Sequence, residues 1–407
     1  MKSINIRNII LFISVTLIFL NLTIYLPFVH LFPFPAYVID ILIFTFLVLF
    51  YLKKRIYFPY QNIIWKWIVY YTMLNIIYFI FSPAGLNEVG YLKLFIFLIF
   101  VMIYLILIFN LDDNQLSFTR KTLVFLAPIA SFSLMIDYFD PGYFYLGFDT
   151  GTLVAGRAAS FYLNANLAGG AMLIFLIFGI DMVPKNYRIL FIIVIFLGLF
   201  FTMSRSSIMV MFLLLGIMFF QKKLYGHHLL ISFVGIMFFF TWLGTGGLDY
   251  FATNYDLKVT ENMRTRVDFF SENSKSDTED MNERKEVLMV ALNMYAENPI
   301  FGSGYGATTF WDYKVSTHNT FAMNWADYGI FGILIIPLMF FFSSYYIFKY
   351  GTQANKQLAW LVLIYFTFSS FTSHNMLEIP LQLGTIMALS TIGYKAYQKY
   401  LITGERL

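Results

Sequence analysis

The hydrophobic positions of the chain fall into long stretches separated by mostly short polar connections. Twelve stretches are near the roughly 20 residues that a helix needs to cross a bilayer: residues 8–29, 36–52, 62–81, 92–109, 122–137, 163–183, 187–203, 206–220, 229–247, 318–348, 357–372 and 376–394. Those at 122–137 and 206–220 are short, so a tilted or partly re-entrant helix is an alternative there. The pattern predicts an all-α polytopic membrane protein with about twelve transmembrane helices.

Composition supports this fold class. Of the 407 residues, 59% are hydrophobic and only 12% are charged, against about 25% charged in an average soluble protein. A water-soluble enzyme, a disordered chain and a nucleic-acid-binding protein are therefore excluded. The chain has no cysteine, which excludes disulfides, thiolate catalysis and cysteine-ligated metals.

The positive charges orient the helices. Alternate connections hold 16 of the 27 Lys and Arg residues: Lys2, Arg7, Lys53, Lys54, Arg55, Arg120, Lys121, Lys185, Arg188, Lys222, Lys223, Lys349, Lys356, Lys395, Lys399 and Arg406. The opposite short connections contribute only Arg157 and Arg205. Because cytoplasmic loops are enriched in Lys and Arg, both termini are expected in the cytoplasm.

The polar connections divide the chain into three parts. Residues 1–247 hold helices one to nine, residues 248–317 form a large periplasmic loop, and residues 318–407 hold helices ten to twelve. The halves show no internal repeat, which weakens a transporter interpretation. Charges within the stretches lie near their ends, where snorkelling suffices. Unusual polar residues cluster instead at the outer ends, which predicts a site at the outer membrane boundary.

Two arginines mark this boundary. Arg205 lies in the tight connection 201–207, where it either snorkels to the headgroups or binds a phosphate through its planar fork of donors. Arg157 precedes the sixth stretch in 156–166, with Asn164 and Asn166 near the start of that helix. A plain loop with a helix cap is the alternative there.

The large loop contains an amphipathic helix over 283–297, with an apolar stripe of Val287, Leu288, Ala291, Met294 and Tyr295. Arg284 lies on this stripe, one turn before Leu288, and is expected to face the bundle or the bilayer. The helix should end at Asn298-Pro299. Glycines 302, 304 and 306 follow, and a turn or close backbone packing explains them better than a nucleotide loop, because no strand precedes them.

His318 and Asn319 begin the tenth stretch, where Ser316 or Thr317 can cap the helix. A histidine in the first turn of a helix stays neutral, as a general base must, although a polar residue at a helix entry is the plain alternative. His374 begins the last stretch and is a candidate supporting residue.

Three arginines and a histidine on the outer face fit a negatively charged, membrane-held substrate whose hydroxyl partner must be activated. Outside the cytoplasmic membrane no nucleotide sugar is supplied, so a polyprenyl diphosphate sugar is the expected donor. Arginines would neutralise the leaving diphosphate and the histidine would take the acceptor proton. No acidic or histidine cluster has clear metal-ligand spacing, which predicts chemistry without metal or cofactor.

These segments resemble the O-antigen ligase and polymerase family of bacterial membrane glycosyltransferases. The resemblance rests on residues 157–166, on Ser204-Arg205-Ser206, on Arg284 with the following helix and residues 298–306, and on His318-Asn319 with Asp327-Tyr-Gly-Ile-Phe-Gly332. It covers about residues 155–335 in motif. The residue matching the family's usual acid is Asp327, two positions before Gly329, and it receives no role.

The resemblance implies a GT-C-like fold of twelve helices with the periplasmic loop over an outer-face cavity. A glycan on undecaprenyl diphosphate would be transferred with inversion, His318 serving as the base. Arg205, Arg284 and, less firmly, Arg157 would hold the diphosphate, supported by Asn319, Asn166 and His374.

A polymerase, which adds the glycan to a second lipid-linked unit, is favoured over a ligase, which adds it to lipid A–core. The expected location is the bacterial inner membrane, and a chain-length regulator is a further candidate partner. A lipid-linked sugar flippase predicts charges at mid-membrane and pseudo-symmetry, which the sequence lacks. A polyprenyl-monophosphate sugar transferase predicts acids in the first outer loop, which is short and acid-free.

Overall fold

The computed structural model describes residues 6–31, 38, 61–81, 111–140, 143–145, 157–255, 278–308, 311, 317–373 and 376–404. Every element in these ranges is helical. The predicted stretches 36–52 and 92–109 lie outside the described residues, apart from residue 38.

The described helices confirm a multi-pass helical membrane protein. Four of them are long and apolar enough to cross a bilayer: Asp113–Phe139, Ala165–Met182, Lys185–Thr202 and Ile330–Tyr350. A bent pair near the N-terminus makes a fifth if it is one span, and shorter apolar helices lie at Ile64–Ile80, Arg205–Phe220 and Gly226–Ile236.

The chain forms two compact units, each built from two separate segments. Unit 1 comprises Met1–Ala36 and Asp113–Glu279, and unit 2 comprises Tyr37–Asp112 and Asp280–Leu407. Both units thus combine an early part of the chain with a much later one.

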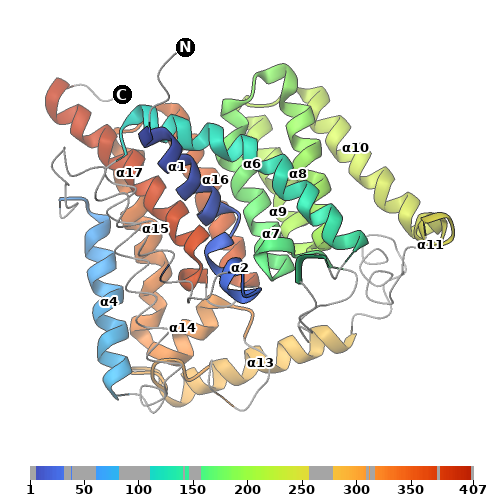
Figure 1. Ribbon diagram of the computed structural model, residues 1–407. Helices are drawn as coiled ribbons and strands as arrows, with labels where there is room; N and C mark the ends of the chain where they lie inside the picture. Colours follow the sequence, from blue (N-terminus) through green and yellow to red (C-terminus); the bar gives the residue numbers. More distant parts are fainter. Residues whose placement is uncertain are drawn as a thin grey trace. The chain divides into compact units, whose positions relative to one another are not determined.

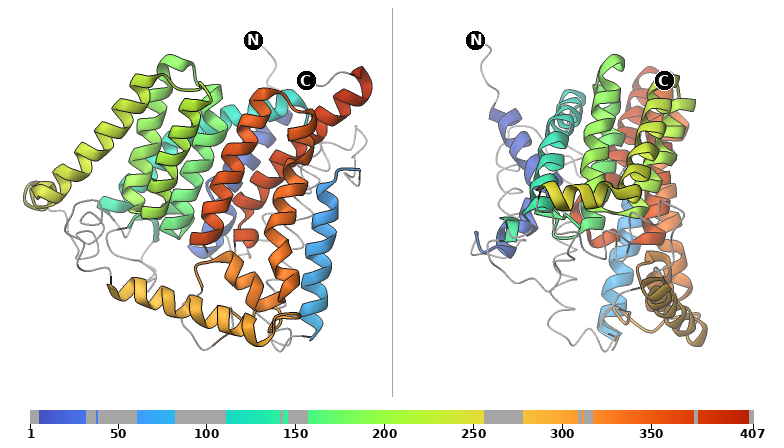
Figure 2. Two further views of the ribbon diagram at one scale, coloured as in Figure 1. Left: turned by 180° about the vertical axis from the view of Figure 1, so that it is seen from behind. Right: turned by 90° about the vertical axis from the view of Figure 1, so that its right-hand side faces the viewer.

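Unit 1 is centred on α7, which packs against α6, α8 and α9. Nearly every residue of α7 is buried, as expected for a helix that is apolar on all sides. Figures 1 and 2 show α7 to α10 as neighbouring helices that run up and down in turn. The elements of unit 1 are α1 (Ile6–Phe19), α2 (Leu22–Phe28), α6 (Asp113–Phe139), η2 (Tyr143–Tyr145), η3 (Ser160–Tyr162), α7 (Ala165–Gly179), η4 (Ile180–Met182), η5 (Lys185–Tyr187), α8 (Arg188–Thr202), α9 (Arg205–Phe220), α10 (Gly226–Trp242), η6 (Leu243–Gly247) and α11 (Leu248–Tyr255).

Two expected spans of unit 1 look different in the structure. The stretch 8–29 is bent by 65° between α1 and α2, because Asn21 adopts a left-handed backbone conformation (φ 56) there. Its side chain Nδ2 donates to the Phe161 carbonyl at 3.1 Å, which holds the bend. The stretch 122–137 belongs to a 27-residue helix, so a re-entrant segment there was the wrong alternative.

Unit 2 is arranged around α15, which packs against α4, α14, α16 and α17. The elements of this unit are α4 (Ile64–Phe81), most of α13 (Thr278–Glu297), α14 (Thr320–Tyr328), α15 (Ile330–Tyr350), α16 (Gln353–Thr372), η7 (Met376–Glu378) and α17 (Pro380–Thr403). Trp67 of α4 is fully buried and donates through Nε1 to the Ile335 carbonyl at 2.8 Å. Helix α13 lies crosswise to α4 and α15 (Figures 1 and 2).

The tenth expected span, 318–348, is two helices rather than one. Helix α14 ends at Tyr328 and α15 begins at Ile330, with Gly329 between them at φ 59. Gly332 lies so close to α14 that a Cβ there would overlap the Asn324 carbonyl oxygen. The break therefore depends on two glycines.

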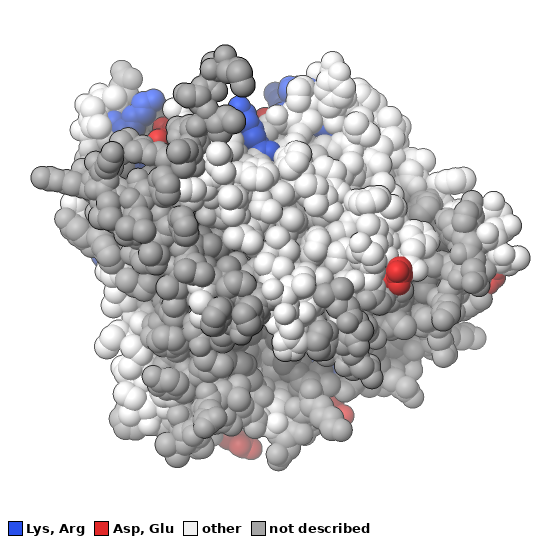
Figure 3. All heavy atoms as spheres, in the orientation of Figure 1, with Lys and Arg blue, Asp and Glu red and all other residues white. Residues whose placement is uncertain are grey.

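Surface charge is sparse, as a lipid environment requires. On the face drawn in Figure 3, most of the described surface is uncharged, Lys and Arg side chains show mainly along the upper edge, and a few Asp and Glu side chains show elsewhere.

Candidate functional site

Unit 1 brings Arg157, Asn166 and the Ser204–Arg205 turn together. Arg157 donates through Nη2 to the Asn166 side-chain oxygen at 2.7 Å and through Nε to the Thr202 carbonyl at 3.3 Å. The Ser204 hydroxyl donates to the same Asn166 oxygen at 3.2 Å. The half-buried Arg205 follows as the first residue of α9. Two of the three predicted arginines thus lie at one end of this unit.

The alternative for the 157–166 segment, a loop with a helix cap, is also correct in part. Asn164 caps α7 by accepting from the backbone N–H groups of Asn166 and Leu167. The cap leaves the side chain of Asn166 to contact Arg157 and Ser204. One asparagine therefore begins the helix and the other organises the arginine.

Asp137, near the end of α6, fixes the segment that carries Arg157. Its Oδ2 accepts from the backbone N–H groups of Ala159 at 2.8 Å and Ser160 at 2.7 Å, and the side chain is 3% exposed. Sequence reasoning missed this residue. An acid at the outer end of an apolar stretch is the signal that could have found it, because buried carboxylates need partners.

Close helix packing places the Ser204 turn beside α7. A Cβ on Gly169 would lie 2.4 Å from the Ser207 hydroxyl oxygen and 3.3 Å from the Ser204 Cβ. Glycine at this position lets α9 approach α7 one turn after Asn166. In the neighbouring 3-10 turn, burial raises the pKa of the Tyr162 phenol, which stays neutral and donates to the Phe19 carbonyl at 3.0 Å.

An apolar groove of about 470 Å³ lies beside this loop in unit 1. Most of its lining residues belong to α6, and Phe161, which also lines it, lies four residues after Arg157. The lining residues are Pro128, Ile129, Phe132, Ser133, Ile136, Tyr143, Phe144 and Phe161. Its size and lining suit a hydrocarbon chain.

In unit 2, Arg284 lies on α13, whose apolar stripe packs as expected. Ala291 is fully buried against Ala322 and Ala326 of α14, with Leu288 and Met294 beside them. The helix ends at Glu297, as predicted, but begins at Thr278, five residues earlier than expected. Arg284, on the same face, is half-buried.

The start of α14 corrects one expectation. The N-cap is Asn319, whose side chain accepts from the Ala322 backbone N–H at 3.1 Å, and not Ser316 or Thr317. His318 therefore lies just outside the helix instead of in its first turn, with a left-handed backbone (φ 47) and a half-buried side chain. A non-glycine residue in this conformation is strained, and such strain is often found at functional positions.

Backbone contacts explain the glycines at 302–306. Ser303 and Gly304 donate their N–H groups to the carbonyls of Ala326 at 2.8 Å and Asp327 at 3.0 Å. A Cβ on Gly302 would lie 2.5 Å from the Asp327 carbonyl oxygen. This confirms close backbone packing as the account of these glycines.

Asp327, which the sequence left without a role, anchors the same segment. It is 3% exposed, and its Oδ1 accepts from both the N–H and the hydroxyl of Thr308 at 3.0 Å. The acid therefore fixes the segment after α13 at Thr308.

His374 lies outside the described residues. The residue before it, Ser373, accepts from the Thr320 hydroxyl at 2.7 Å, so the end of α16 adjoins the start of α14. Within the described ranges no three His, Asp or Glu side chains are grouped as metal ligands, and metal-independent chemistry stays a prediction.

Comparison with known protein families gives a match over part of the chain. Residues 189–336 match the sequence model of the O-antigen ligase family. Over this stretch the chain is similar to the O-antigen ligase family. No curated protein matches it.

The O-antigen ligase match includes Arg205, Arg284, His318 and Asn319, whereas Arg157 and Asn166 precede it. Proteins of this family are glycosyltransferase-like. The family implies substrates that are lipid-linked oligosaccharides in a membrane. The contacts of Arg157 with Asn166 and Thr202 connect it to the matched region, because Thr202 lies within that region.

Proposed function

We propose that the chain is an O-antigen polymerase. It would transfer a growing glycan from undecaprenyl diphosphate to a sugar hydroxyl of another lipid-linked repeat unit. The reaction inverts the anomeric carbon and needs no metal. The observation that carries the proposal is the Arg157–Asn166–Ser204 network, which holds Arg157 beside the turn that precedes Arg205, in a chain that is similar to the O-antigen ligase family over residues 189–336.

Each step has a proposed residue. The acceptor hydroxyl loses its proton to the His318 imidazole as its oxygen forms a bond to the anomeric carbon. The bond from that carbon to the diphosphate oxygen breaks, and undecaprenyl diphosphate leaves as an anion. Arg205, Arg284 and Arg157 neutralise this anion through charge-assisted hydrogen bonds. Asn166 and Asn319 position Arg157 and the start of α14, and His374 is the remaining supporting candidate.

The apolar groove on α6 supports a lipid-linked donor. A diphosphate bound by Arg157 leaves its hydrocarbon chain near Phe161, which lines the groove. Burying each CH₂ group of such a chain contributes about 0.8 kcal/mol. We place the polyprenyl chain there.

The proposed topology follows the charges. Twelve helices, with both termini in the cytoplasm and residues 248–317 in the periplasm between helices 9 and 10, leave Arg157 and Arg205 on the outer face of the inner membrane. Most of the Lys and Arg residues in the connections then lie on the cytoplasmic side.

A ligase that transfers the glycan to lipid A–core is the second candidate, because the matched family model carries that description. The many Phe and Tyr residues, 49 and 29, favour the polymerase by the resemblance to polymerases of variable polysaccharide clusters.

The decisive experiment reconstitutes the full chain with a lipid-linked repeat unit in the presence of EDTA. Wild type should form a ladder of lipid-linked oligomers, and His318→Ala and Arg284→Ala should lose it. His227→Ala is the matched control, because this exposed histidine starts α10 away from the proposed residues.

Each result has a clear meaning. Product formed only after lipid A–core is added would identify a ligase. Full activity of His318→Ala would remove the proposed base, and loss of activity with EDTA would overturn metal independence.

A further inference from the structure

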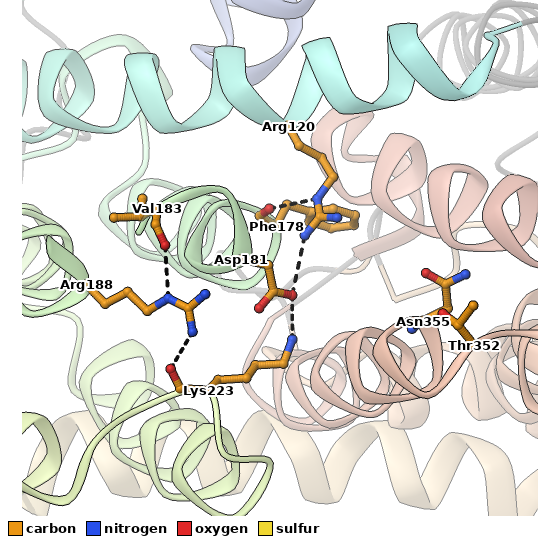
Figure 4. Close-up of polar contacts among 8 residues, drawn as sticks. All are labelled: Arg120, Phe178, Asp181, Val183, Arg188, Lys223, Thr352 and Asn355. Carbon is orange, nitrogen blue, oxygen red and sulfur yellow. Dashed lines mark hydrogen bonds and ion pairs between the residues drawn. The ribbon is translucent and has the colours of Figure 1, made fainter. Parts of the chain in front are cut away.

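A second group of charged side chains lies in unit 1, at the end of α7 opposite Asn166. Lys223, between α9 and α10, donates through Nζ to Asp181 Oδ2 at 2.6 Å, and Arg120 of α6 approaches the same oxygen through Nη2 at 3.5 Å. Arg188 donates to the carbonyls of Val183 and Lys223. Figure 4 shows Arg120 and Lys223 approaching Asp181 from two sides, with Arg188 beside the Lys223 backbone. We call Arg120, Asp181, Arg188 and Lys223 the basic cluster.

The basic cluster holds three cations and only one carboxylate. Lys223 and Arg188 are 6% and 8% exposed, so water solvates their charges poorly. Burial lowers the pKa of the Lys223 ammonium; the Asp181 carboxylate opposes this, while the charges of Arg120 and Arg188 lower the pKa further. Poorly solvated cations that outnumber the nearby anions favour the binding of a further anion.

Donors for such an anion remain. Arg120 donates hydrogen bonds through Nε to the Phe178 carbonyl and through Nη2 to Asp181. Arg188 donates through Nε and Nη1 to backbone carbonyls. Among the described residues, neither Arg120 Nη1 nor Arg188 Nη2 has an acceptor. A phosphate oxygen is the acceptor that suits a guanidinium best.

The position of the cluster indicates where the phosphate comes from. One apolar span ends at Met182 and the next begins at Lys185, so the cluster lies where the hydrocarbon gives way to headgroups. Lys185 also lies over the Tyr225 ring at 5.7 Å, and tyrosine is enriched at this level of membranes.

Local backbone strain directs Lys223 inward. Lys222 has a left-handed backbone (φ 59) directly after α9, and the Lys223 N–H then donates to the Met218 carbonyl at 2.9 Å. A lysine in this conformation costs energy that glycine would avoid. The strained turn buries Lys223 beside Asp181 and leaves Lys222 exposed.

We propose that the basic cluster binds the phosphate of an anionic phospholipid headgroup in the leaflet at this end of unit 1. Basic pockets between transmembrane helices recognise lipid headgroups in this way. The site is separate from the proposed catalytic residues and does not depend on the polymerase assignment.

The test uses the full-length protein in nanodiscs of phosphatidylcholine. Dioctanoyl phosphatidylglycerol is titrated, and the rise in Tm gives the half-saturating concentration. Arg120→Gln should raise that concentration at least about fivefold, because a basic residue in direct contact with an anionic headgroup contributes about 1 kcal/mol to binding. Lys222→Gln removes one positive charge from the exposed residue next to Lys223 and should leave the half-saturating concentration unchanged.

Asp181→Asn separates lipid binding from a purely structural ion-pair network. If the cluster binds phosphate, removing the competing carboxylate lowers the half-saturating concentration, even though Tm without lipid falls. Weaker binding in Asp181→Asn, or equal binding in wild type and Arg120→Gln, would overturn the proposal. The same Tm rise with inorganic phosphate or dioctanoyl phosphatidylcholine would also overturn a lipid site.

Discussion

At the scale of single residues, Asp137 and Asp327 perform the same task in different units. Each is a carboxylate with 3% exposure, and each accepts hydrogen bonds from two groups of a neighbouring loop. A buried carboxylate is costly unless several donors satisfy it. Their hydrogen bonds therefore fix the segment that carries Arg157 and the segment that ends at Thr308 more firmly than neutral acceptors would.

Asp137→Asn should loosen the segment that carries Arg157. A neutral amide accepts more weakly from Ala159 and Ser160, a loss of about 1–3 kcal/mol. We expect a lower Tm and a KM for the lipid-linked donor that rises about tenfold. Asp140→Asn, at the exposed residue after α6, should leave both unchanged, and equal KM values for the two variants would contradict the role of Asp137.

At the scale of elements, Gly329 permits the break between α14 and α15. Gly329→Ala places a Cβ 2.5 Å from the Ile300 carbonyl oxygen at a φ of +59. The variant should lose about 1–3 kcal/mol of stability, measured as a fall in Tm. Gly216→Ala, where a Cβ meets nothing within 4 Å, is the matched control and should be no less stable than wild type.

Helix α13 depends on a small residue at its contact with α14. Ala291→Leu adds three carbons where Ala291 is fully buried, and overpacking of this kind costs about 1–3 kcal/mol. Oligomer formation in the reconstituted assay should fall. Asn293→Leu, on the exposed side of the same helix, should retain activity, and a normal rate in Ala291→Leu would show that this packing is dispensable.

The helices that the sequence predicted correctly are those with continuous apolar stretches, such as α7 and α8, because hydropathy reports burial in lipid directly. The α14–α15 break escaped prediction because Gly329-Ile-Phe-Gly332 is itself apolar. The N-cap at Asn319 escaped because Ser, Thr and Asn cap equally well and only the fold selects among them. The arginines and His318 were predictable because charged residues are unusual at the outer ends of the apolar stretches. The role of Asp137 was not, because its partners Ala159 and Ser160 lie more than 20 residues later in the chain.

At the scale of the whole molecule, the topology can be tested without altering native thiols, because the chain has none. Single-cysteine variants Lys222→Cys and Asn298→Cys, both at exposed positions, should react with a membrane-impermeant maleimide from opposite sides. In intact cells only Asn298→Cys should be labelled, and Lys222→Cys only after lysis. Labelling of both from outside would overturn the proposed orientation.

Because each unit combines segments that are far apart in the sequence, early helices are synthesised well before their partners. The hydrogen bond from Trp67 to Ile335 joins residues 268 positions apart, which at about 5–20 residues per second correspond to roughly 10–50 s of translation. Helix α4 therefore stays in the bilayer for that time before Trp67 can donate to Ile335 and before Asn75 can accept the hydrogen bond from the Tyr328 hydroxyl at 2.8 Å. An insertase or chaperone that shields α4 during this interval should increase the yield of folded protein.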